Sequence, residues 1–180
     1  MTDTDTDTDT GTGTGTGSAA STTGRGAVLA AHLDAINERV VAAVESCTDE
    51  QWRRPTAAEG WPVGVVAHHI AEVQQAFVRV LGALATGEPN PATMSSAEVE
   101  RNNARHARDQ AAVGKAETLD ALRTSGPELG RLLRGLDDEQ VQEVALVFDG
   151  NEMTVAQVVE LALVGHFGEH LDSIRATTAD

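Results

Sequence analysis

Apolar residues recur at steps of three and four along the chain beyond its first 24 residues. This period is typical of amphipathic α-helices, which bury one face. One stripe predicts a helix over about 27–47. A second predicts a helix over about 62–85, which starts at a proline suited to a first helical turn and ends before the helix-breaking segment GEPNP.

Two further helical regions follow in the middle of the chain. The first opens at Ser95, which has Glu98 at capping-box spacing. The second covers about 115–136, and we expect Gly126 and Pro127 to kink or interrupt it.

The last helix differs from the others because its apolar residues spread over nearly all of its surface. We expect it from Thr154, which has a capping-box partner in Gln157, to about Ala176. A helix of this kind usually lies at the centre of a protein. The segment before it, 137–151, carries the turn signal DGN and is expected to be a turn-rich connection.

These elements predict an all-α protein, and an antiparallel four-helix bundle is the most economical way to pack them. The 180 residues suit one domain with a tail. Residues 1–24 alternate Thr with Asp and then Thr with Gly, so we expect a disordered low-complexity tail there. The folded domain is expected to be 25–180.

Charge and composition narrow the range of partners. The formal net charge is −15, and such an acidic chain repels phosphate backbones, so nucleic acid is not an expected partner. The single cysteine, Cys47, excludes an intramolecular disulfide and Cys-rich zinc sites. No apolar run is long enough to cross a membrane, and the N-terminus lacks the features of a secretory signal. We therefore expect a cytoplasmic protein without membrane association.

Histidines supply the most informative chemistry. His166 and His170 are four residues apart in the last helix and therefore project from nearly the same face. His69 lies at the edge of the apolar stripe of the second helix, whereas His68 shares a face with polar residues and is expected to face solvent. Three imidazoles and an open position would suit Zn²⁺, and also Ni²⁺ or Fe²⁺. The alternative is three partly buried histidines that hydrogen-bond to backbone and carboxylates.

Two segments resemble the DinB-like family. GWPVGVVAHHIAEV is similar to its second-helix signature, in which a metal-binding histidine follows a tryptophan by eight residues, and LALVGHFGEHLDSIR is similar to its last helix. The resemblance covers about 26–176 and implies that His69, His166 and His170 are metal ligands. Pro62 stands where the family usually has Ser or Thr, which affects the helix start but not the ligand spacing.

The resemblance implies two enzymatic functions, and a third, non-catalytic function stays open beside them. The first is an enzyme that uses a low-molecular-weight thiol such as mycothiol or bacillithiol, acting on a small-molecule electrophile as a transferase or a maleylpyruvate-isomerase-like isomerase. The second is a metal-dependent hydrolase. The third is a non-catalytic bundle that binds metal or forms a homodimer. The sequence alone does not decide the metal, the substrate or the oligomeric state.

For each of several other polar residues, a functional and a purely structural interpretation are both possible. Glu169 could orient a ligand or act as a base, or it could be a solvated helix residue. HFGEH matches a protease pattern, but too few residues follow it to supply the further ligand such a protease needs. Asn103, His106 and Gln110 form a polar stripe that could line a pocket, although a solvated face is the favoured interpretation.

Overall fold

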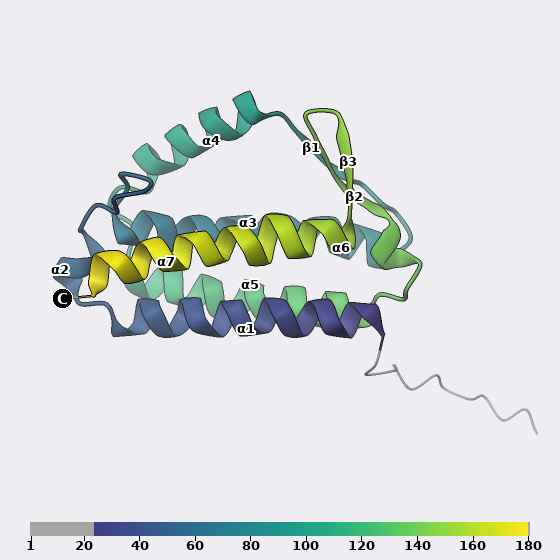
Figure 1. Cartoon of the computed structure of the whole chain (residues 1–180), viewed down its shortest axis with the longest axis horizontal. Helices are drawn as coiled ribbons and strands as arrows, with labels where there is room; N and C mark the ends of the chain where they lie inside the picture. Colours follow the sequence, from purple (N-terminus) through teal and green to yellow (C-terminus); the bar gives the residue numbers. More distant parts are fainter. Residues whose placement is uncertain (1–23, 180) are drawn as a thin grey trace, which may run out of the picture.

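The computed structural model describes residues 24–179, so most of the predicted disordered tail lies outside the described residues. The predicted helical bundle is confirmed, because four long rods lie side by side (Figure 1). The rods are α1 (Arg25–Ser46), α3 (Val63–Ala85), α5 (Lys115–Gly135) and a last rod made of α6 (Val155–Gln157), η2 (Val158–Gly165) and α7 (His166–Thr178). Within the described part of the chain, no helix has the length and apolar character needed to cross a membrane.

The rods run two in each direction, in an order that the hydrophobic pattern did not reveal. Lys115, at the start of α5, contacts the carbonyl oxygen of Glu45 near the end of α1, so these two helices are antiparallel. The Gln51 side chain, in the short α2 (Asp49–Trp52) that follows α1, donates to the carbonyl of Thr178 at the end of α7. Thus α1 and α7 share one direction, and α3 and α5 share the other.

Because α3 and α5 are parallel, the chain must return between them on the outside of the bundle. It does so through α4 (Ser96–Asp109), which lies above α3 and at an angle to it in Figure 1. The capping box predicted at Ser95 and Glu98 is present at its start. This return helix brings polar side chains onto the first half of α3, and it therefore matters for the site.

The segment 137–151 is more ordered than the turn-rich connection that the sequence predicted. After a short 3₁₀ turn, η1 (Gln140–Gln142), it forms strand β2 (Val144–Phe148), which pairs with β3 (Asn151–Thr154) in a hairpin and with β1 (Ala92–Met94) in parallel. The expected reversal is correct: Asp149 and Gly150 both have positive φ, at 47° and 78°, as a two-residue hairpin turn requires. The strands are too short for a clear alternating pattern, which is why the sequence did not indicate them.

The predicted interruption of the 115–136 helix is wrong, because α5 continues through Pro127. A proline inside a helix removes one backbone hydrogen bond. Here the surrounding contacts outweigh that loss, since α5 buries a row of leucines against its neighbours. Gly126 adds to this packing, because a Cβ there would meet the Asn37 side chain at 2.4 Å.

A buried polar network fixes the axial positions of three helices. Gln74 of α3 donates to Asn37 of α1 at 2.9 Å, and Ser125 of α5 donates to Gln74 at 2.7 Å. All three side chains are buried, so sliding one helix would leave unpaired polar groups in the core. Gln74 lies little more than one turn beyond His69, so the network also sets the height of that histidine.

The start of α3 is held by an aromatic contact. The Trp52 indole donates to the carbonyl of Val113 at 3.0 Å and packs on Gly64, where an added Cβ would lie 2.4 Å from the ring. Only a glycine allows this approach.

Replacing Gly64 by alanine should therefore destabilise the protein. We expect Gly64→Ala to lower the free energy of unfolding by about 1–3 kcal/mol, because it overpacks the indole of Trp52. Gly82→Ala in the same helix is the matched control: it meets no atom within 4 Å and should raise stability by about 0.5–1 kcal/mol. Denaturant unfolding measures both, and equal effects would contradict this account of the packing.

Candidate metal centre

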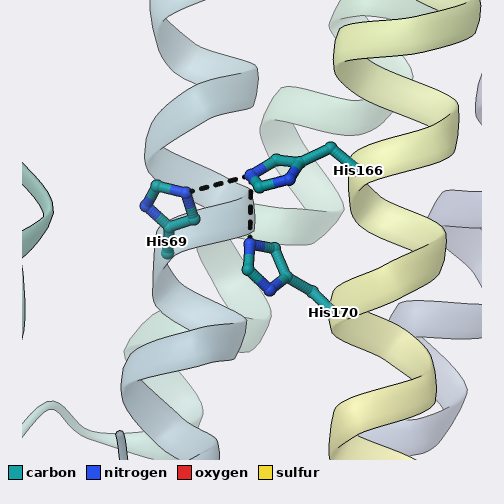
Figure 2. A group of neighbouring side chains, drawn as sticks. All are labelled: His69, His166 and His170. Atoms are coloured by element: carbon teal, nitrogen blue, oxygen red, sulfur yellow. Dashed lines mark hydrogen bonds between the residues drawn. The ribbon is translucent and has the colours of Figure 1, made fainter. Parts of the chain in front are cut away.

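The three histidines singled out by the sequence lie together between α3 and α7. His69 comes from α3, and His166 and His170 come from the first turns of α7 (Figure 2). His69 and His170 are 8% and 6% exposed, and His166 is half-buried.

Their Nε2 atoms face one another. The Nε2 atom of His166 lies 3.4 Å from that of His69 and 3.0 Å from that of His170. Ligand nitrogens at ordinary bond lengths around a tetrahedral Zn²⁺ are about 3.3 Å apart. The three lone pairs can therefore point at one common ion with little rearrangement.

The backbone before His166 is unusual. The eight residues Val158–Gly165 form a π-helix, and α-helical geometry resumes at His166. A π-helix is wider than an α-helix and is frequent at functional sites. It changes the phase of the rod just before the two histidines, so the direction in which both rings point depends on it.

A carboxylate orients one of the three rings. Glu59 Oε1 lies 2.8 Å from Nδ1 of His170, and Glu59 Oε2 accepts from the hydroxyls of Ser173 and Thr56 at 2.6 and 2.7 Å. Burial tends to raise the pKa of Glu59, but hydrogen bonds from Ser173, Thr56 and His170 outweigh it, so the pKa lies below its usual value. The ionised carboxylate holds the His170 proton on Nδ1 and leaves Nε2 free to bind a metal.

The sequence pattern gave no indication that Glu59 belongs to this site. It lies in the loop between α2 and α3, followed by Gly60 with φ of 70°, and its partner His170 is 111 residues away. No periodicity links the two positions. Only the acidic residue's closeness to Trp61 in the family-like segment could have drawn attention to it.

His69 is held in its neutral form. Burial lowers its pKa to about 3, and the positive charges that His170, His166, His106 and His68 would carry add to the shift. A neutral imidazole is the form that binds a metal. His69 can therefore bind a metal ion at neutral pH without first losing a proton.

His166 has a lowered pKa for similar reasons, namely burial and then the neighbouring His170. The charges of Glu169 and Glu59 act in the opposite direction. Glu169 is exposed, and among residues 24–179 it makes no hydrogen bond to any of the three histidines. Its role as a base or an orienting group thus remains a prediction.

A second group of side chains lies on the other side of His69. His106, expected on a solvated face, is buried: its Nε2 is 3.2 Å from the carbonyl oxygen of Val65, and its Nδ1 is 2.7 Å from Glu72 Oε2. The expectation that His68 faces solvent was also wrong, because His68 is half-buried and stacks on His106, with ring centroids 5.2 Å apart. Both errors have one cause: the sequence pattern did not show that α4 returns over α3.

The comparison with known proteins agrees with this architecture. Residues 32–174, which include all three histidines, match the model of the DinB superfamily, and the chain therefore belongs to that superfamily. It is similar to YfiT from Bacillus subtilis, with a TM-score of 0.69 and 23% sequence identity over 86% of each chain. YfiT is described as a probable metal-dependent hydrolase with an unusual four-helix bundle topology. At that identity the likeness shows a common fold. None of the curated proteins matches the chain.

The lowered pKa of His69 predicts how the metal-free protein responds to acid. Between pH 6.5 and about 3 the unfolded chain binds more protons at His69 than the folded protein does, so stability falls as the pH falls through this window. Below pH 4.5, protonation of Glu59 acts in the same direction. We expect His69→Phe to flatten the pH dependence of unfolding between pH 7 and 5, with His32→Gln on the surface as control. An unchanged slope in His69→Phe would refute the argument.

Proposed function

We propose that this protein is a metal-dependent enzyme in which His69, His166 and His170 hold one divalent transition-metal ion. The observation that carries the proposal is the convergence of the three Nε2 atoms, two of whose separations are 3.4 and 3.0 Å. Imidazole ligands suit Zn²⁺ best among abundant ions, and Ni²⁺ or Fe²⁺ also accept them.

The protonation and orientation of the three histidines also suit metal binding, in addition to the distances between their Nε2 atoms. His69 is neutral because of its burial, and His170 is turned by Glu59 so that its bare nitrogen faces inward. Three protein ligands leave a coordination position open, which is the pattern of catalytic rather than structural sites. The bound ion would act as a Lewis acid that makes a thiol or a water molecule a stronger nucleophile near neutral pH.

We further propose that the nucleophile is a low-molecular-weight thiol and that its partner is a small-molecule electrophile, in a transfer or isomerisation reaction. Cys47 is the chain's one cysteine, and it is buried in the core, where burial raises its pKa. It is therefore a poor nucleophile, and the reactive sulfur would come from a bound small molecule.

Hydrolysis is the second candidate, and the description of YfiT favours it. The same three histidines would serve, with water in place of the thiol. The two candidates differ in the nucleophile and not in the ligand set.

Metal content is the first test. We expect purified protein to contain close to one equivalent of a transition metal, and His166→Ala to lose most of it, because two imidazoles hold an ion much less tightly than three. His32→Ala, which removes an exposed histidine paired with Glu160 on another part of the surface, is the control and should keep the metal. Elemental analysis gives the answer, and negligible metal in the unmodified protein would remove the basis of the proposal.

Removal of the Glu59 carboxylate should weaken the site without abolishing it. We expect Glu59→Ala, which removes both oxygens that bond to His170 and Ser173, to lower metal affinity by about 10–100-fold, the usual cost of losing the group that orients a histidine ligand. Competition with a chelating dye measures the affinity. A change below twofold would show that Glu59 does not orient His170.

Turnover separates the two reactions. We expect metal-loaded protein to accelerate the addition of a small thiol to an electrophile, and His166→Ala to remove the acceleration. Faster hydrolysis of activated esters or amides without a thiol would instead support the hydrolase. A protein that binds the ion but accelerates neither reaction would contradict both enzyme proposals and favour a non-catalytic metal-binding bundle.

A further inference from the structure

One nitrogen atom of the three-histidine site has no hydrogen-bond partner in the described part of the chain. Nδ1 of His69 is buried and makes no hydrogen bond within the described part of the chain. Figure 2 shows that this atom lies on the side of the ring that faces away from His166 and His170. His106 and Glu72 lie beside the same ring: the ring centroids of His69 and His106 are 5.4 Å apart, and Glu72 belongs to the same close group.

Metal binding would make the missing hydrogen-bond partner of Nδ1 more costly in free energy. A free neutral imidazole can place its proton on either nitrogen and so choose the arrangement that costs least. When Nε2 binds an ion, the proton must stay on Nδ1. A buried N–H without an acceptor is unfavourable, and metal-bound histidines almost always donate this proton to a carboxylate, a carbonyl or water.

Glu72 is well placed to accept it. It follows His69 by three residues on α3, and residues with that spacing are neighbours on a helix surface. A ring nitrogen of His69, a carboxylate oxygen of Glu72 and a ring nitrogen of His106 all lie within 4.8 Å of one another. Oε2 of Glu72 contacts His106, whereas Oε1 has no hydrogen bond or ion pair among residues 24–179.

Glu59 provides a precedent within the same site. One of its oxygens takes the Nδ1 proton of His170, while the other is held by the hydroxyls of Ser173 and Thr56. Glu72 has the same arrangement in part: one oxygen is held by His106, and the other is free.

We propose that Glu72 is a positioning residue for the metal centre, with Oε1 accepting the Nδ1 proton of His69 while Oε2 stays on His106. This inference rests on the proposed metal site. It makes α4 part of that site, because the carboxylate would connect a ligand on α3 to a histidine on the return helix.

The contacts argue against two other roles for the group formed by His69, Glu72 and His106. A second cation on His69, Glu72 and His106 would have to compete for nitrogens of His106 that already face two oxygens, those of Val65 and Glu72. His68 also has a buried unpartnered Nδ1, but it is not part of the close group and, as a non-ligand, it keeps its choice of tautomer.

The test measures zinc stoichiometry and affinity of the full chain with Glu72→Ala and Glu72→Gln. We expect one ion throughout, with affinity lower by about 10–100-fold in Glu72→Ala and by less in Glu72→Gln, whose amide oxygen still accepts a hydrogen bond. Glu100→Gln, on the exposed face of α4, removes the same charge and should bind like the unmodified protein. Because the Glu72 side chain is 58% exposed, both variants should fold, which circular dichroism checks.

A spectroscopic readout separates positioning from a general effect on the fold. In zinc-loaded protein with ¹⁵N-labelled histidine, we expect the Nδ1–H of His69 to exchange slowly with water and to be shifted downfield by its carboxylate acceptor. In Glu72→Ala this resonance should move upfield and exchange faster, while that of His170, held by Glu59, stays in place.

The outcomes are distinct. One ion in every protein, with equal affinity and an unmoved His69 resonance, would overturn the role of Glu72 and leave the metal proposal intact. Two ions in the unmodified protein and one in Glu72→Ala would make Glu72 a ligand of a second ion and overturn the inference. No ion in the unmodified protein would refute the proposed metal site, and the inference with it.

Discussion

The site depends on keeping His69 and His166 neutral while three imidazoles are packed against one another. Burial is the main cause, since it lowers the pKa of His69 to about 3 and also lowers that of His166. Rings that carried charge would repel one another at Nε2 separations of 3.0–3.4 Å. Neutral rings at this distance instead direct lone pairs toward one point, and this is the property from which the proposed chemistry follows.

Two rigid supports hold the rings in place. On one side, the buried Asn37–Gln74–Ser125 network fixes the height of α3, and the Trp52–Gly64 contact fixes its start. On the other side, the π-helix sets the rotation of α7. Glu59 then joins the two sides, because its loop precedes α3 and its carboxylate bonds to α7. The positions of the rings are therefore determined by the fold of the bundle as well as by the histidines themselves.

Local periodicity in the sequence was enough to predict the helices and part of the histidine site. The helix stripes, the capping boxes and the i,i+4 spacing of His166 and His170 depend on neighbouring residues, and the structure contains all of them. The placement of His69 next to the other two rings also agrees with its position at the edge of an apolar stripe.

Contacts between segments that are far apart in the sequence could not be predicted from local periodicity. Glu59 meets a partner 111 residues away, and no pattern in a single sequence connects a loop carboxylate to a later helix. His106 is on a polar stripe, which usually means solvent, but the return of α4 over α3 buries it. The short strands β2 and β3 are stabilised by pairing with each other and with β1, and their residues alone gave no signal.

X-ray absorption at the metal edge of zinc-loaded protein shows directly whether three histidines hold the ion. We expect three imidazole nitrogens at about 2.0–2.1 Å with the outer-shell scattering of histidine rings, and one further light ligand. A spectrum with only oxygen ligands, or with fewer than three imidazoles, would contradict this expectation.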